Sequence, residues 1–276
     1  MMNQILCSTG ALIGRPNGRD YHLLEQFSPQ LHCDGFEFLF YDTWYEEAGE
    51  LTEYLKGLKL NIPVMHCEKR IAEPIADGGP EGLREAFRLF EINCRTASEL
   101  GAQKMVLHLW NGLISDSHFG NNLQAYPALR ETAEKYGLML LVENVVCHQD
   151  PLSHWVELYQ HYPDIRFVFD TKMADFHRQL ESIYEPDYAW LWQENHIAHY
   201  HVNDYGGGYR DWNNLKVLQM GKGHIDFDRF FRFIRETGYS GGLTFEGTGF
   251  DSTGNVNIRN LNNQFDLARS YLTREA

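Results

Sequence analysis

The chain has 276 residues, 43% of them hydrophobic, and its 24 Lys and Arg against 38 Asp and Glu give a formal net charge of −14. Such a surface repels phosphate backbones at long range, so composition argues against a nucleic-acid partner, although a local basic cleft stays open. No apolar run approaches the roughly 18 residues of a membrane span. The five cysteines are scattered without a CxxC pair, so we expect reduced thiols in a cytoplasmic protein without membrane partners.

The length fits one domain of the size common for α/β barrels. No stretch rich in Pro, Gly and Ser interrupts the chain, and its composition does not change along its length. We therefore predict a single domain that spans residues 1–276.

Short apolar stretches and helical patterns alternate through the first half of the chain. Residues 35–40 (GFEFLF) place Phe at every second position, as a strand does. Residues 80–100 carry apolar side chains at a 3.6-residue spacing and end before Gly101, as a helix does. For this half we predict strands at residues 5–8, 35–40, 61–65 and 104–107, and helices at residues 21–27, 46–58 and 80–100.

The most informative stretch of the second half is residues 138–142 (LMLLV), five apolar residues in a row before Glu143. An unbroken apolar run predicts a strand buried on both faces, as in a parallel sheet covered by helices. Similar short runs recur to the end of the chain. For this half we predict strands at residues 138–142, 165–169, 198–200 and 242–245, and helices at residues 123–136, 152–162, 188–194, 227–237 and 264–272.

Eight strands, each followed by helical sequence, predict a (β/α)8 TIM barrel. A doubly wound open sheet would alternate in the same way. However, no GxGxxG or GxxxxGK[ST] motif follows the first strand, and polar residues end almost every strand instead of gathering at one switch point. These two features favour the closed barrel.

Four of the predicted strands are followed by a residue that can bind a metal ion: Glu143, Asp170, His201 and Glu246. The carboxyl ends of barrel strands converge on one mouth, so we expect these side chains to share a pocket. Three carboxylates in one pocket repel one another, and a divalent cation relieves that cost. Mn²⁺, Mg²⁺ or Co²⁺ suits this donor set, and Zn²⁺ also fits. The alternative is that each acid caps a helix or pairs with an Arg.

Other polar and aromatic residues lie near the predicted strand ends. His66 and His108 follow the third and fourth strands and could bind metal or substrate, or simply line the mouth. Trp110, in the next loop, could form an apolar wall of the pocket together with aromatic residues of the loop after the seventh strand. His199 shares a strand with His201, and we expect the two to face opposite sides, with His201 inward.

Four segments carry a family resemblance: residues 141–144 (LVEN), 201–204 (HVND), 220–227 (MGKGHIDF) and 238–246 (GYSGGLTFE). On these segments the chain resembles the xylose-isomerase-like barrel family of sugar phosphate isomerases and epimerases. That family includes ketose 3-epimerases and hydroxypyruvate isomerase and is related to endonuclease IV. The resemblance covers nearly the whole chain, and the last two segments are its most specific part.

The resemblance implies a divalent-metal-dependent isomerase or epimerase of a small sugar or related polyhydroxy carbonyl compound. One metal ion would be held by the matching residues Glu143, Asp170, His201 and Glu246. The two Glu residues would also form the acid/base pair that moves a proton through an enediolate, which the metal stabilises. Arg210 would hold substrate hydroxyls, His148 would contact substrate, and the family resemblance also implies a homo-oligomer.

Departures from the family pattern keep other functions open. Met173 stands where the family usually has a metal-binding or substrate-binding His, which gives weight to a barrel that binds metal and sugar without catalysis. A dehydratase or lyase acting on a polyhydroxy acid would use the same site. The nuclease branch needs that His and a later Asp-x-His pair, so we disfavour it. Lys172, Lys222 and Arg210 could bind a carboxylate or phosphate or be solvated loop charges.

Overall fold

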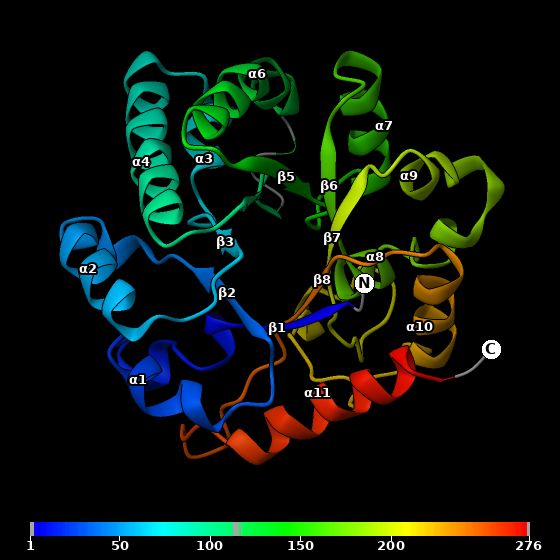
Figure 1. Ribbon diagram of the computed structural model, residues 1–276. Helices are drawn as coiled ribbons and strands as arrows, with labels where there is room; N and C mark the ends of the chain where they lie inside the picture. The colour runs from blue at the N-terminus through cyan, green and yellow to red at the C-terminus, as the bar shows by residue number, and fades with distance from the viewer. Residues whose placement is uncertain (1–2, 113–115, 117, 275–276) are drawn as a thin grey trace. The chain divides into compact units, whose positions relative to one another are not determined.

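The computed structural model describes residues 3–112, 116 and 118–274. Its strands form a closed parallel barrel in chain order from β1 to β8 (Figure 1). Strand β1 closes the barrel because it pairs with β2 on one side and with β8 on the other, where Cys7 is in register with Phe245. The predicted (β/α)8 architecture is confirmed. The strands are β1 (Gln4–Ser8), β2 (Gly35–Leu39), β3 (Val64–His66), β4 (Lys104–Leu107), β5 (Met139–Glu143), β6 (Arg166–Asp170), β7 (Ile197–His201) and β8 (Gly242–Phe245).

Helices follow the strands along the chain, as the βα pattern requires. They are α1 (Leu23–Phe27), α2 (Ala48–Leu58), α3 (Ala72–Asp77), α4 (Pro80–Glu99), α6 (Phe119–Lys135), α7 (Pro151–His161), α8 (Thr171–Phe176), α9 (Trp190–Gln193), α10 (Phe227–Glu236) and α11 (Ile258–Leu272). Short 3-10 turns occupy Thr9–Ala11, Arg15–Asn17, Ser28–Gln30, Asp42–Trp44, Glu181–Tyr184, Pro186–Tyr188 and Trp212–Asn214. Among the described residues, no helix combines the length and apolar character needed to cross a membrane.

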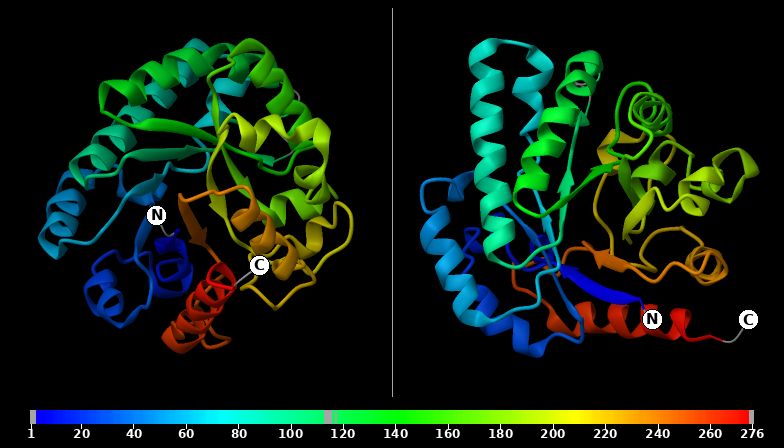
Figure 2. Two further views of the ribbon diagram at one scale, coloured as in Figure 1. Left: turned by 45° about the vertical axis from the view of Figure 1, so that its right-hand side comes forward. Right: turned by 45° about the horizontal axis from the view of Figure 1, so that its top comes forward.

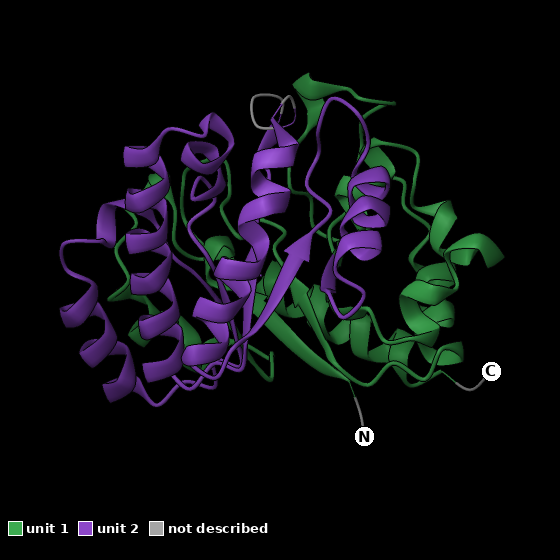
Figure 3. Ribbon diagram, turned by 90° about the horizontal axis from the view of Figure 1, so that it is seen from above, with its two compact units in different colours: residues 1–37, 169–276 green, residues 38–168 purple. Residues whose placement is uncertain are grey.

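The chain divides into two compact units, coloured separately in Figure 3. Unit 1 comprises residues 1–37 and 169–276, and unit 2 comprises residues 38–168. The division falls inside strands β2 and β6, so each of these strands contributes residues to both units. The single domain expected for residues 1–276 stays a prediction.

Unit 2 is built on the paired strands β4 and β5, against which α6 packs, with α4 beside it (Figure 2). Helix α7 begins where Asp150 Oδ1 accepts a hydrogen bond from Ser153 N (2.8 Å), with Pro151 at the first helical position. Its Trp155 stacks on Phe167 of β6 with ring centroids 4.3 Å apart. Burying aromatic rings of this size fixes the helix against the strand.

Unit 1 places α10 and α11 next to each other, and α11 also contacts β1 (Figure 1). Helix α10 begins where Asp226 Oδ1 accepts from Arg229 N (3.0 Å). Its buried face contains Phe227, Phe230, Phe231, Phe233 and Ile234. Each such side chain contributes about 1.5–3 kcal/mol on burial. The Phe residues of this helix are therefore packing residues.

The structure differs from the predicted elements where polar residues begin a helix. Helix α11 starts at Ile258, six residues before the predicted start, because Asn257 Oδ1 accepts from Asn260 N (3.0 Å) and caps a first turn with little apolar character. Helix α8 was not predicted at all. Its residues are almost all buried, so its sequence shows no contrast between a polar and an apolar face.

Candidate active site

Strands β6, β7 and β8 bring three potential ligands together within unit 1. One ligand atom from each of Asp170, His201 and Glu246 lies within 4.8 Å of the others. Asp170 and His201 are fully buried, and the Glu246 side chain is 10% exposed. The convergence expected for these three residues is therefore present in the fold.

Asn203 links the two carboxylates of this group. Its Nδ2 donates to Asp170 Oδ2 (2.7 Å) and to Glu246 Oε2 (2.7 Å), and its Oδ1 accepts from Glu246 N (3.2 Å). A neutral amide that donates to both carboxylates holds them together without removing their negative charge. In the sequence this residue lies within the segment HVND, where no local pattern indicates its two side-chain hydrogen bonds.

Glu37 of β2 supports His201 from the other side. Its carboxylate lies 3.0 Å from His201 Nε2, and it accepts from Thr244 Oγ1 (2.8 Å). Burial alone would raise the pKa of the Glu37 carboxyl, but His201 and His199 outweigh burial and hold the pKa well below its ordinary value. An ionised carboxylate accepts hydrogen bonds, so His201 carries its proton on Nε2 and turns Nδ1 towards Glu246 Oε2, 3.7 Å away.

The expectation that His199 and His201 face opposite sides is wrong. Both Nε2 atoms lie 3.0 Å from a Glu37 carboxylate oxygen. Residues two positions apart on a strand share a face, since side chains alternate with a period of two. His199 therefore also points inward, one layer below His201.

Asp204 holds residues 220–227 (MGKGHIDF), one of the two most specific segments of the family resemblance, in place. Its buried carboxylate accepts four backbone hydrogen bonds, from Tyr205, Gly221, Gly223 and Ile225. A Cβ at Gly223 would lie 2.1 Å from the Tyr205 carbonyl oxygen, so only glycine fits there. The segment MGKGHIDF is thus tied to the loop that follows His201.

Unit 2 contains a second group of buried ligands, Glu143, His66 and His108. His66 Nδ1 lies 2.7 Å from the Cys67 carbonyl oxygen and therefore carries a proton. Its Nε2 lies 3.3 Å from Glu143 Oε2, and His108 Nε2 lies 2.8 Å from the same oxygen. Both imidazoles therefore meet one carboxylate oxygen within this unit, and the roles expected for His66 and His108 stay predictions.

The environment of His108 keeps its imidazole neutral. Burial lowers the pKa of His108 to about 4, against the opposing influence of Glu143. A neutral His108 that donates from Nε2 to Glu143 has its acceptor at Nδ1, which is enclosed and has no hydrogen-bond partner among the described residues.

The remaining predicted contact residues lie in varied surroundings. Trp110 is fully buried and donates from Nε1 to the Val145 carbonyl (2.6 Å), as a packing residue would. His148 is exposed, and Arg210 is half-buried with a positive φ of 53°. Met173 is buried, and its backbone N donates to Asp170 Oδ1 (2.8 Å), so Asp170 caps the start of α8 through this residue's backbone.

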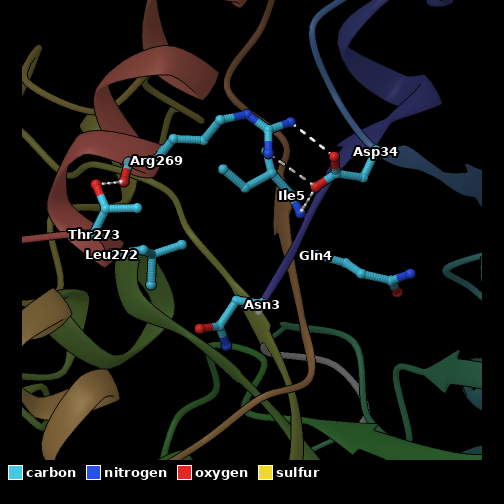
Figure 4. Close-up of a pocket in the computed structure, with 7 residues that line it drawn as sticks. All are labelled: Asn3, Gln4, Ile5, Asp34, Arg269, Leu272 and Thr273. Carbon is cyan, nitrogen blue, oxygen red and sulfur yellow. Dashed lines mark hydrogen bonds and ion pairs between the residues drawn. The ribbon is translucent and has the colours of Figure 1, made fainter. Parts of the chain in front are cut away.

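A separate pocket of about 660 Å³ opens at the amino end of β1 (Figure 4). Arg269 and Asp34 form an ion pair at its edge, where Arg269 Nη2 donates to Asp34 Oδ1 (2.9 Å) and Ile5 N donates to Asp34 Oδ2 (2.8 Å). The pocket lies at the end of β1 opposite to the strand ends that carry Asp170, His201 and Glu246.

The donor chemistry at those strand ends fits a divalent cation. Asp170 and Glu246 offer carboxylate oxygens and His201 offers one imidazole nitrogen, all buried or nearly so. Oxygen donors with one nitrogen suit Mn²⁺, Mg²⁺ or Co²⁺ and also accommodate Zn²⁺. The Glu37 contact supplies the outer hydrogen bond that a ligating histidine usually makes.

Comparison with known families agrees with this arrangement. A family model described as xylose isomerase-like TIM barrel matches residues 29–266. The chain belongs to this family. The resemblance drawn from the four sequence segments is thereby confirmed.

Related proteins span nearly the full chain. Protein MJ1311 of Methanocaldococcus jannaschii is 26% identical over 261 residues, which cover 84% of this chain and 80% of that protein. Escherichia coli 3-keto-D-glucoside 4-epimerase has a TM-score of 0.69 at 15% identity, covering 97% of this chain and 99% of that one.

Two further structures are similar. A D-tagatose 3-epimerase-like protein has a TM-score of 0.66 at 20% identity, with 98% and 97% of the two chains covered. The IolI protein, whose structure holds a zinc atom, has a TM-score of 0.67 at 18% identity, with 98% and 100% covered. At these identities the likeness shows a shared fold.

Proposed function

We propose that this protein is a divalent-metal-dependent isomerase or epimerase of a small sugar or related polyhydroxy carbonyl compound. The observation that carries the proposal is the Asn203 amide, which holds Asp170 and Glu246 together beside His201. Two similar structures support it, since one is a 3-keto-D-glucoside 4-epimerase and another is D-tagatose 3-epimerase-like.

Glu143 is the fourth residue of the proposed metal set, with Asp170, His201 and Glu246. Its support is the sheet register, in which Glu143 pairs with Val168 in the parallel ladder between β5 and β6. Asp170 lies two residues further along β6, so the pleat turns the side chains of Glu143 and Asp170 to the same face of the sheet. Zinc in the IolI structure agrees with a metal-binding role for this fold.

The proposed chemistry divides between the cation and the two glutamates. A bound divalent cation supplies a Lewis acid that polarises a carbonyl group. Glu143 and Glu246 transfer the proton, one removing it from the carbon beside the carbonyl and the other returning one to the enediolate. Glu246 suits this role because Asn203 fixes one of its oxygens while the side chain keeps 10% of its surface exposed.

We also propose substrate contacts from residues at or after the carboxyl ends of strands. His66 and His108 meet Glu143 Oε2 and would orient hydroxyl groups beside that carboxylate. Arg210 and His148 complete the proposed set, with Arg210 holding substrate hydroxyls, whereas the fully buried Trp110 contributes packing only. A neutral His108 can donate or accept a hydrogen bond, which suits a polyhydroxy compound.

Replacing Glu246 with Gln tests the proposal. We expect the exchange of substrate hydrogen for solvent deuterium, followed by NMR on D-tagatose and D-allulose with added Mn²⁺ or Co²⁺, to fall at least about 10²-fold, the usual range for loss of a general acid or base. Glu236→Gln, an exposed carboxylate on α10, is the matched control and should keep normal exchange.

Near-normal exchange in Glu246→Gln would remove this residue from the reaction. Formation of a UV-absorbing unsaturated product by the wild type would identify a dehydratase instead. Tight sugar binding without any deuterium incorporation would identify a binding protein.

A further inference from the structure

Lys172 is a buried cation that has no partner among the residues that the structure describes. Its side chain is 3% exposed. Within residues 3–112, 116 and 118–274, no side-chain hydrogen bond or ion pair reaches it. Lys172 Nζ is not one of the fully enclosed polar atoms that lack a hydrogen-bond partner. The ammonium therefore borders a small open space, while the aliphatic stem is buried.

Three buried carboxylates of unit 1 all have partners. Asp204 accepts four backbone N–H groups, Glu37 meets two imidazoles and Thr244, and Asp170 accepts from Asn203 and Met173. An ammonium that reaches only a small open space is poorly hydrated, and a ligand that supplies the opposite charge there offsets the cost. Lys172 therefore differs from its neighbours in a way that points to a missing anion.

The position of Lys172 connects it to the proposed active site. It follows Asp170 by two residues, so their Cα atoms are at most about 7.6 Å apart. That separation is comparable to the length of a small sugar derivative. Met173, the next residue, is apolar and buried.

We propose that Lys172 binds an anionic group, a carboxylate or a phosphate, on the substrate of this site. The inference rests on the proposed function and narrows its substrate class to acidic sugars or sugar phosphates. A protein with a net charge of −14 repels anions at long range, so a local cation is needed to hold one. A lysine ammonium serves as a point charge for either group.

A matched set of ligands tests the proposal: D-tagatose, D-tagatose 6-phosphate and D-tagaturonate, which differ at one end of the molecule. In the wild type we expect deuterium exchange with kcat/KM about 10-fold to 100-fold higher for one anionic member than for D-tagatose, the range of a charge-assisted hydrogen bond. The better anion distinguishes phosphate from carboxylate. Lys172→Met should lose this preference mainly through KM, and Lys172→Arg should keep part of it.

Lys135→Met on the surface of α6 changes the net charge equally and should behave as the wild type. Ligand-free Lys172→Met should melt at the same or a higher temperature, because a poorly hydrated charge without a partner has been removed, whereas a purely structural lysine would stabilise the wild type. Equal activity of the wild type on all three ligands, or an unchanged preference in Lys172→Met, would overturn the proposal.

A separate measurement distinguishes failure of the Lys172 anion site from failure of the proposed isomerase or epimerase function. If the wild type exchanges deuterium with none of the ligands, calorimetric titration with D-tagaturonate and with inorganic phosphate decides. Binding that disappears in Lys172→Met upholds the anion site without the isomerase. Absent binding, or equal binding by both proteins, refutes the anion site.

Discussion

The two ends of the unit 1 strands are built differently. At the carboxyl ends, Asp170, His201 and Glu246 are buried and held by Asn203 and Glu37. At the amino end of β1 there is a pocket of about 660 Å³ whose polar edge is the partly exposed pair of Arg269 and Asp34.

The difference teaches that the size of a pocket does not by itself locate the reactive side chains. A roomy pocket is a common first hypothesis for a binding site, but barrel enzymes place catalytic groups at the carboxyl ends of the strands and stabilising contacts at the other end. Here the fixed donors are at the carboxyl ends, and the pocket of about 660 Å³ is at the amino end of β1. We therefore expect substitutions at the carboxyl ends to change activity and metal binding, and substitutions at the amino-end pocket to change stability.

The largest effect among the supporting residues is expected at Glu37. Glu37→Gln keeps the shape but removes the negative charge that holds the proton on His201 Nε2. Loss of such an outer partner weakens metal binding by about 10-fold to 100-fold. Calorimetric titration with Mn²⁺ and with Co²⁺ measures the change, and Glu236→Gln is the control of equal charge. Unchanged affinity in a folded Glu37→Gln protein would show that Glu37 serves packing alone.

A smaller effect, on stability, is expected at His108 in unit 2. Its pKa of about 4 in the folded protein lies below the value of about 6.5 in the unfolded chain, so acid protonates the unfolded chain first. The stability that depends on neutral His108 is complete above pH 6.5 and is lost as the pH falls towards 4. Between pH 7 and pH 5 the loss should be about 2 kcal/mol.

Urea unfolding of the wild type and His108→Gln at the two pH values measures this contribution. The variant should lose about 2 kcal/mol less than the wild type over this interval. Equal losses in both proteins would mean that His108 is protonated in the fold, and its contact with Glu143 would then be an ion pair.

The sequence predicts the barrel and the strand-end ligands because both depend on local patterns. Apolar runs reveal buried strands, and a polar residue after each run marks the end of a parallel strand. Asp170, His201 and Glu246 could be brought together by this reasoning alone. Their convergence in the fold follows from closure of the barrel.

The supporting residues could not be predicted in the same way. Glu37 alternates with Phe36 and Phe38, so its position in the pattern is that of a polar residue on a solvated face. In a closed barrel the second face is the interior, and the partner His199 is 162 residues away in sequence. The hydrogen bonds of Asn203 likewise depend on which strand ends become neighbours.

The smallest effect is expected at the amino-end pocket. Arg269→Ala removes an ion pair whose side chains are 39% and 36% exposed, and exposed pairs contribute about 0.2–1 kcal/mol. Asp34 still accepts from Ile5 N in the variant, so the start of β1 keeps its hydrogen bond. We expect urea unfolding to show a loss of at most about 1 kcal/mol and metal affinity and deuterium exchange to be unchanged. A loss of exchange at normal stability would place function at this pocket and reverse the comparison, because no strand-end donor is altered by the substitution.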